Sequence, residues 1–187
     1  MSFEFDLKPK RLSHRERREV HEAFTGVAGP YGEVTVTVTA VPQRAELSSA
    51  SLPPAWIHHP DVLRDDLVWI DDATRLVVAG QEARLTQNRR ALGKADRALR
   101  IRLGDRHYTY LATGMSAEEL HEEKRGPLIR VRYNSYKNRA LTVLPEADAR
   151  DLSLGLILQG ARTDNLTLTG AIISGVWRFL DSGRADI

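Results

Sequence analysis

The stretch Glu33-Val-Thr-Val-Thr-Val-Thr-Ala-Val41 decides the fold class, because its apolar and polar residues alternate strictly. Successive side chains of a β-strand point to opposite faces, so the valines would share one face of a sheet and the threonines the other. Glycines and prolines in segment 26–32 and a Ser/Pro-rich segment at 48–54 are typical of turns on either side. The sequence therefore predicts a half-buried strand between two turns.

More short β-rich runs follow toward the C-terminal end. The Asp-rich residues 71–74 and the pair Gly104-Asp105 have the composition of hairpin turns between such runs. The expected strands beyond 33–41 lie at 67–70, 75–79, 98–103, 107–111, 128–133 and 140–144. Strands in hairpin-like succession predict an antiparallel sheet that is curled or closed on itself.

A short helix is expected among these strands. Ser116 with Glu119 three residues later has the spacing of a capping box, and Gly126-Pro127 would end the helix. Glu118, His121 and Glu122 would have the i, i+3, i+4 spacing of metal ligands on it, but a solvated acidic face fits these residues better.

Two apolar segments come last. Asp148 or Asp151 would cap a helix that runs through leucines toward Gly160, although its first part also suits a strand. Residues 166–180 are apolar nearly all round at helical spacing, which is the pattern of a helix buried on several sides. The expected fold class is α+β, mainly antiparallel β, as a curled sheet or barrel with C-terminal apolar helical segments packed in it or against it.

Length and composition limit the alternatives. The chain has 187 residues, which favours one β-rich domain over residues 26–187, preceded by a basic N-terminal arm or helix over residues 1–25. The absence of cysteine excludes disulfides, thiolate nucleophiles and cysteine-ligated metal centres. No segment has the apolar run of a signal peptide or of a membrane helix, which predicts a cytoplasmic protein without a transmembrane span. The Ala-, Arg-, Asp-, Gly- and Leu-rich residue usage suggests a bacterial source.

The run Asp148-Ala-Arg-Asp-Leu-Ser-Leu-Gly-Leu-Ile-Leu158, placed after a succession of strands, resembles the tubby-like superfamily, in particular its bacterial scramblase-like and LURP-one-related members. The resemblance covers residues 65–180. It implies an antiparallel barrel that encloses an apolar C-terminal helix, and binding of a phosphoinositide or another anionic partner in some relatives. The chain departs from the family pattern by its second apolar run, and the usual hairpin motifs are not clear before Asp65.

Arginine is the most informative side chain for function. The net charge is only +2, but residues 84–106 carry eight basic residues against two acidic ones. Alternation would place Arg100 and Arg102 on one face of a strand, and Arg130 and Arg132 on one face of another. If those strands are neighbours, four guanidinium groups share one sheet surface and would bind phosphate oxygens of a lipid headgroup or a nucleic acid. The alternative is that these arginines solvate an exposed face and pair with acidic residues.

The N-terminal segment offers a second basic surface. Lys8, Lys10 and Arg11, followed by further arginines up to residue 18, would form an arm that docks on phosphates or anionic lipid. A solvated surface helix explains the same charges.

Sequence patterns for a catalytic or metal-binding site are weaker than the basic patterns described above. The run His58-His59-Pro60-Asp61 invites a metal hypothesis, but neighbouring side chains on an extended chain point in opposite directions. Asp61 with Glu82 and Arg84 resembles a metal-dependent nuclease pattern in which arginine replaces the usual lysine. We assign no metal site and no cofactor.

Three functions remain open. The sequence favours a non-enzymatic binding module for an anionic partner through an arginine-bearing sheet face. The alternatives are a metal-dependent hydrolase or nuclease, and a structural subunit whose residues 166–180 form a homo-oligomer contact.

Overall fold

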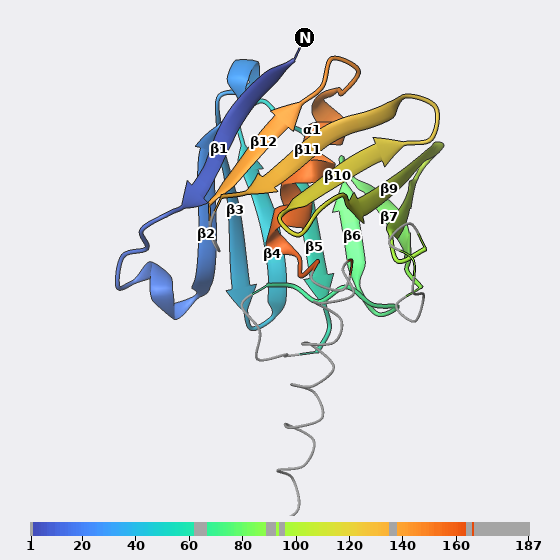
Figure 1. The fold of residues 1–187 in the computed structure, drawn as a ribbon. Helices are drawn as coiled ribbons and strands as arrows, with labels where there is room; N and C mark the ends of the chain where they lie inside the picture. The colour runs from blue at the N-terminus through green and yellow to red at the C-terminus, as the bar shows by residue number, and fades with distance from the viewer. Residues whose placement is uncertain are drawn as a thin grey trace, which may run out of the picture.

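The computed structural model describes residues 2–61, 67–88, 93, 96–134, 138–163 and 166. Its strands form a closed antiparallel barrel of twelve strands in the described part of the chain (Figure 1). Each strand pairs with its neighbours in sequence, and β1 closes the barrel by pairing with both β12 and β2. The strands are β1 (Phe3–Pro9), β2 (Val20–Val27), β3 (Glu33–Ala40), β4 (Gln43–Ser49), β5 (Ala55–His59), β6 (Arg75–Val78), β7 (Gln81–Thr86), β8 (Leu99–Leu103), β9 (Arg106–Ala112), β10 (Ala117–Glu122), β11 (Gly126–Tyr133) and β12 (Arg139–Val143).

Alternate residues of the strands fill the inside of the barrel. Val34, Val36 and Val38 of β3 are at most 1% exposed, whereas the threonines between them are half-buried on the other face. β8 repeats the pattern with buried apolar residues and exposed arginines. The predicted strand at 33–41 and the mainly antiparallel β fold class are therefore confirmed.

One helix, α1 (Ala149–Ile157), lies within the barrel, where Figure 1 shows it surrounded by strands. Asp148 is its N-cap: the Asp148 side chain accepts hydrogen bonds from the backbone N–H groups of Arg150 and Asp151, and the Asp151 side chain accepts one from the backbone N–H of Asp148. This reciprocal capping box favours a helix over a strand at this position. The first apolar C-terminal segment is thus a buried helix, continued by the short 3-10 helix η3 (Leu158–Gly160).

α1 and η3 pack closely against the strands of the barrel because each has a glycine where it contacts them. A Cβ atom on Gly155 would lie 2.4 Å from the Ile129 side chain, and one on Gly160 would lie 2.5 Å from Cβ of Ala45. Beyond the helix, Leu166 is buried. The rest of the predicted second helix, 167–180, lies outside the described residues.

The helix predicted after Ser116 is wrong, because residues 117–122 form β10. Glu118, Leu120 and Glu122 point inward and are buried, while the residues between them are half-buried on the other face. The sequence does not show the apolar and polar alternation of a strand here, because two of the inward side chains are carboxylates. Charged residues are rarely fully buried unless they are paired.

Other boundaries also differ from expectation. Within segment 1–25, expected as a basic arm or helix, β1 and β2 are strands of the barrel, joined through the short 3-10 helix η1 (Glu16–Arg18). The predicted strand at 67–70 is wrong: in its described residues Val68 makes only an isolated parallel bridge to Ala161, just after the helix. The sequence pattern did not predict β4, β5 or β7.

No helix among the described residues has both the length and the apolar character needed to cross a membrane.

Candidate anion-binding groove

The two predicted arginine strands are not neighbours. Arg100 and Arg102 lie on β8, which pairs with β7 and β9, whereas Arg130 and Arg132 lie on β11, which pairs with β10 and β12. β9 and β10 therefore stand between the two pairs, and the surface of four guanidinium groups that depended on adjacency does not form.

Arg130 is engaged locally. Its Nε donates a hydrogen bond to Oε1 of Glu119 at 3.1 Å, and Nε2 of His121 lies 2.7 Å from Oε2 of the same carboxylate. Arg132 is exposed, and its Cα partners on the neighbouring strands are Ala117 and Ala140. Arg130 therefore fits the alternative in which basic side chains of an outer face pair with acids, and Arg132 fits the alternative in which they solvate that face.

The predicted N-terminal residues are largely balanced by acids. Nζ of Lys8 lies 3.3 Å from the Asp6 carboxylate, and Nζ of Lys10 lies 3.1 Å from Glu16. The backbone N–H of Ser13 is the main reason why the pKa of Glu16 falls to about 2, so Glu16 keeps its charge beside Lys10. Arg11 is exposed. These lysines are therefore weaker anion-site candidates than unpaired arginines.

A third arginine joins Arg100 and Arg102. Arg84 on β7 stands directly opposite Arg102 in the antiparallel register, and Thr86 stands opposite Arg100. All three arginines are exposed, and among the described residues no carboxylate forms an ion pair with any of them. Like charges directly opposite on neighbouring strands destabilise a sheet. Arg84, Arg100 and Arg102, here called the arginine cluster, are therefore a surface where an anion would relieve repulsion.

The arginine cluster lines a groove of about 750 Å³ over the outer faces of β7, β8, β9 and β10. His107 and His121 also line it. His107 stands opposite Arg102 in the register of β8 and β9, and its Nδ1 lies 3.0 Å from the Glu123 carboxylate, so the β9 and β10 side of the groove carries histidine and carboxylate side chains. The positive charge is therefore concentrated at one side of the groove.

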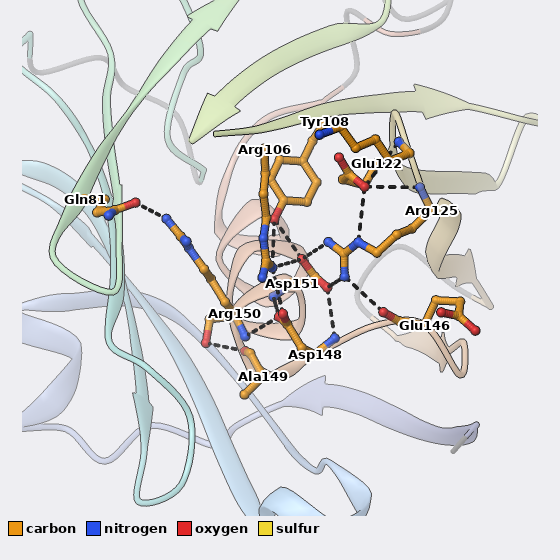
Figure 2. A network of polar contacts seen from close by, with 12 residues as sticks. Gln81, Arg106, Tyr108, Glu122, Arg125, Glu146, Asp148, Ala149, Arg150 and Asp151 are labelled. Atoms are coloured by element: carbon orange, nitrogen blue, oxygen red, sulfur yellow. Dashed lines mark hydrogen bonds and ion pairs between the residues drawn. The ribbon is translucent and has the colours of Figure 1, made fainter. Parts of the chain in front are cut away.

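Beneath this groove, a buried carboxylate fastens the start of α1 to the wall. Asp151 is fully buried, and its carboxylate accepts hydrogen bonds from three side chains (Figure 2). Arg125 donates from Nη1 at 2.7 Å and from Nη2 at 3.0 Å. Arg106 donates from Nη1 at 3.0 Å, and the Tyr108 hydroxyl donates at 2.7 Å. Arg106 also pairs with Asp148 at 2.7 Å. Burial, together with the Asp151 charge, raises the pKa of Tyr108 to about 12, so its hydroxyl remains a donor. Both arginines come from hairpin ends, and they join those hairpins to the helix.

A second buried carboxylate lies at the other end of α1. Glu118 accepts hydrogen bonds from the hydroxyls of Tyr110 at 2.5 Å, Tyr133 at 2.5 Å and Thr163 at 2.7 Å. Burial raises the pKa of Glu118 above its usual range, and the buried Arg139 guanidinium opposes that rise. Nε2 of Gln159 donates to the Tyr110 hydroxyl at 3.1 Å and so links η3 to this cluster.

Substitution of Glu118 by Gln is expected to change how stability depends on pH. Because burial raises the Glu118 pKa, the native state holds this proton at pH values where the unfolded chain, with a carboxyl pKa near 4.5, has lost it. The wild-type free energy of unfolding should therefore fall relative to Glu118→Gln as pH rises above about 4.5, and the difference should be flat below it. Urea unfolding at several pH values measures this, and a difference independent of pH would contradict it.

Tyr108 and Tyr110 stand at alternate positions of β9, and both are turned into the barrel. They bind the two buried carboxylates, one at each end of the helix. The sequence signal that would have found these clusters is the pair of tyrosines at alternate positions, since a buried tyrosine hydroxyl needs a polar partner.

His58 and His59 are neighbours on β5 and point to opposite faces of the sheet, as successive residues of a strand do. His59 is buried, with Nε2 at 3.0 Å from Asp71 and Nδ1 accepting the backbone N–H of Asp61 at 3.2 Å, so both ring nitrogens are occupied. Glu82, the second carboxylate of the nuclease hypothesis, forms a bidentate pair with Arg75. Within the described ranges, no group of three or more histidine or carboxylate side chains is arranged to hold a metal ion.

Comparison with known proteins adds no relative to this description. The chain matches no protein-family model, no curated protein and no solved structure at a significant level.

Proposed function

We propose that this chain is a binding module for a phosphate-bearing anionic partner, and that the arginine cluster of Arg84, Arg100 and Arg102 binds it. The observation that carries the proposal is the direct pairing of Arg84 with Arg102 across two strands, without an ion-paired carboxylate among the described residues. A bound anion would convert this repulsion into attraction.

The chemistry of guanidinium supports a phosphate ligand. Each group presents a planar fork of N–H donors that matches two phosphate oxygens, and hydrogen bonds between ionised partners are about twice as strong as neutral ones. Neighbouring strands lie about 4.8 Å apart, and alternate residues of one strand about 6.7 Å apart, so three long arginine side chains can converge on one group. Thr86 and Thr109 line the same groove and offer hydroxyl donors.

Two sources of phosphate were expected from the sequence, a lipid headgroup and a nucleic acid. Both would meet the arginine cluster through the same oxygen atoms. Arg84 is added to the residues expected from the sequence, while Arg130 and Arg132 are left out because β9 and β10 separate them from the arginine cluster. Membership of the tubby-like superfamily stays a proposal as well, supported by the closed barrel around a buried helix that the resemblance implies.

A matched pair of double variants tests the proposal. Arg84→Gln with Arg102→Gln should weaken binding about 10-fold or more, because charge-assisted hydrogen bonds contribute about 1.5–3 kcal/mol each. Arg130→Gln with Arg132→Gln removes the same charge from the same barrel and should change affinity by less than about twofold. Binding of the wild-type chain should also weaken at high salt.

The measurement is titration of the full chain with three probes: inorganic phosphate, phosphatidylinositol-phosphate vesicles and a single-stranded oligonucleotide. Binding of any probe that is lost in the first variant and kept in the second supports the proposal. Absence of binding to all three probes, or equal loss in both variants, would overturn it.

A further inference from the structure

A second hollow continues the groove along β7 and β8. Its volume is about 680 Å³, and it shares Thr86 and Arg100 with the arginine groove. Its other described lining residues are Gln87, Asn88, Gly93, Asp96 and Ala98. A ligand held by the arginine cluster would therefore extend into this hollow, here called the polar annex.

The polar annex differs in chemistry from the arginine groove. Apart from the shared Arg100, its described lining is made of a hydroxyl, two amides, two small residues and the exposed carboxylate of Asp96. A carboxylate accepts hydrogen bonds only, and it repels a second phosphate. The amide and hydroxyl groups both donate and accept. This combination suits an uncharged body that carries several hydroxyl groups.

The Asp96 carboxylate lies beside Gly93. A Cβ atom on Gly93 would lie 2.8 Å from Oδ2 of Asp96, so the absence of a side chain at Gly93 leaves room for this carboxylate. The backbone N–H of Arg97, the residue after Asp96, donates to the Gly93 carbonyl at 3.1 Å.

A nucleic acid strand fits the two hollows less well. Binding of single strands uses a basic stripe along the backbone and exposed aromatic rings on which bases stack. The aromatic residue among the described lining is Tyr108, which is 2% exposed and bonded through its hydroxyl to Asp151. Carboxylates lie on both sides of the arginine cluster, Asp96 on one and Glu123 on the other. Among the described lining residues, this charge pattern suits one compact anionic group.

We propose that the ligand is a phosphomonoester of a small polyhydroxylated molecule, with its phosphate on Arg84, Arg100 and Arg102 and its hydroxyl groups on Thr86 and Asp96. This inference rests on the proposed function and narrows it from any phosphate-bearing partner to one ligand class. The observation that supports this ligand class is the position of the polar annex, with its Asp96 carboxylate, beside the arginine cluster along β7 and β8.

The probes are inorganic phosphate, ribose 5-phosphate and ribose, each titrated calorimetrically into the full chain. Ribose 5-phosphate should bind about 10-fold or more tightly than inorganic phosphate, because hydrogen bonds from hydroxyls to a carboxylate add to the phosphate contacts. Ribose alone should bind at least about 10-fold more weakly than ribose 5-phosphate, since it lacks the charged group.

Two variants separate the annex from the arginine cluster. Asp96→Ala should weaken ribose 5-phosphate by about fivefold or more, yet leave inorganic phosphate unchanged or slightly tighter, because a negative charge near the cluster has been removed. Arg84→Gln should weaken both phosphate-bearing probes. Arg132→Gln, outside both hollows, is the matched control and should weaken neither.

Failure of this inference is distinct from failure of the proposed function. Equal affinity for ribose 5-phosphate and inorganic phosphate, or an Asp96→Ala effect that is the same for both, would overturn the ligand class but leave the arginine cluster as an anion site. Binding of the vesicle or oligonucleotide probes without binding of ribose 5-phosphate would also overturn it. Binding of no anion would overturn both proposals.

Discussion

Asp151→Ala should lower the free energy of unfolding by about 3–5 kcal/mol, the largest loss expected from any single substitution considered in this chain. Asp151 is fully buried and is shared by Arg106, Arg125 and Tyr108. Its removal leaves two guanidinium groups without their common counter-charge, and it also removes one half of the capping box at the start of α1. Small domains have total stabilities of about 5–15 kcal/mol, so the variant should be close to unfolding at 37 °C.

Guanidinium chloride unfolding followed by circular dichroism measures this loss. The control is Asp6→Ala, which breaks an exposed pair with Lys8 and should cost less than about 1 kcal/mol. A loss of under about 1 kcal/mol for Asp151→Ala would mean that the buried ion cluster is not what holds the helix in the barrel.

Gly160→Val should lower the free energy of unfolding by about 2–3 kcal/mol, because it forces extra atoms into a filled interior. A Cβ atom at this position would lie 2.5 Å from Cβ of Ala45 and 3.2 Å from Cγ1 of Val36. Ala45 cannot move aside by rotating a side chain, since its Cβ is fixed to the backbone of β4. Either η3 or the wall must shift.

The matched control is Gly114→Val. A Cβ there would lie 3.6 Å from Cβ of Ala117, an ordinary contact, and its effect should stay below about 1 kcal/mol. Thermal and chemical unfolding of both variants give the comparison. Equal stability of the two variants would show that η3 does not approach the wall as closely as the structure places it.

Strands with an apolar inner face were predictable because their pattern is local. Val34, Val36 and Val38 alternate with threonines, and Leu99 and Ile101 alternate with arginines, so period-two patterning alone assigns each to a face. The start of α1 was predictable as Asp148 or Asp151 for the same reason, since a helix cap depends on a few consecutive residues; the structure assigns Asp148 as the N-cap and Asp151 as its capping-box partner.

β10 was not predictable in that way. Its inward Glu118 and Glu122 have the appearance of surface charges until their partners are known. The partners of Glu118 lie 8 residues away for Tyr110, 15 for Tyr133 and 45 for Thr163. Arg125, the partner of Glu122, is only three residues away, but it lies in the turn after the strand. A charged side chain can face a core only when other groups pair with it, and for Glu118 most of those groups are distant in the chain.

The sequence by itself determined that this chain builds sheet from alternating strands, that Asp148 or Asp151 begins a helix, and that Arg100 and Arg102 share one face of a strand, since each property depends on residues close together in the chain. Only the tertiary structure decided which strands adjoin. Strand order separated Arg130 and Arg132 from the groove and brought Arg84 to Arg102 instead. The same order placed Asp151 between Arg106 and Arg125. The physical reason is that backbone hydrogen bonds between strands are the same for every sequence, so the choice of neighbour depends on how the whole core packs around the helix.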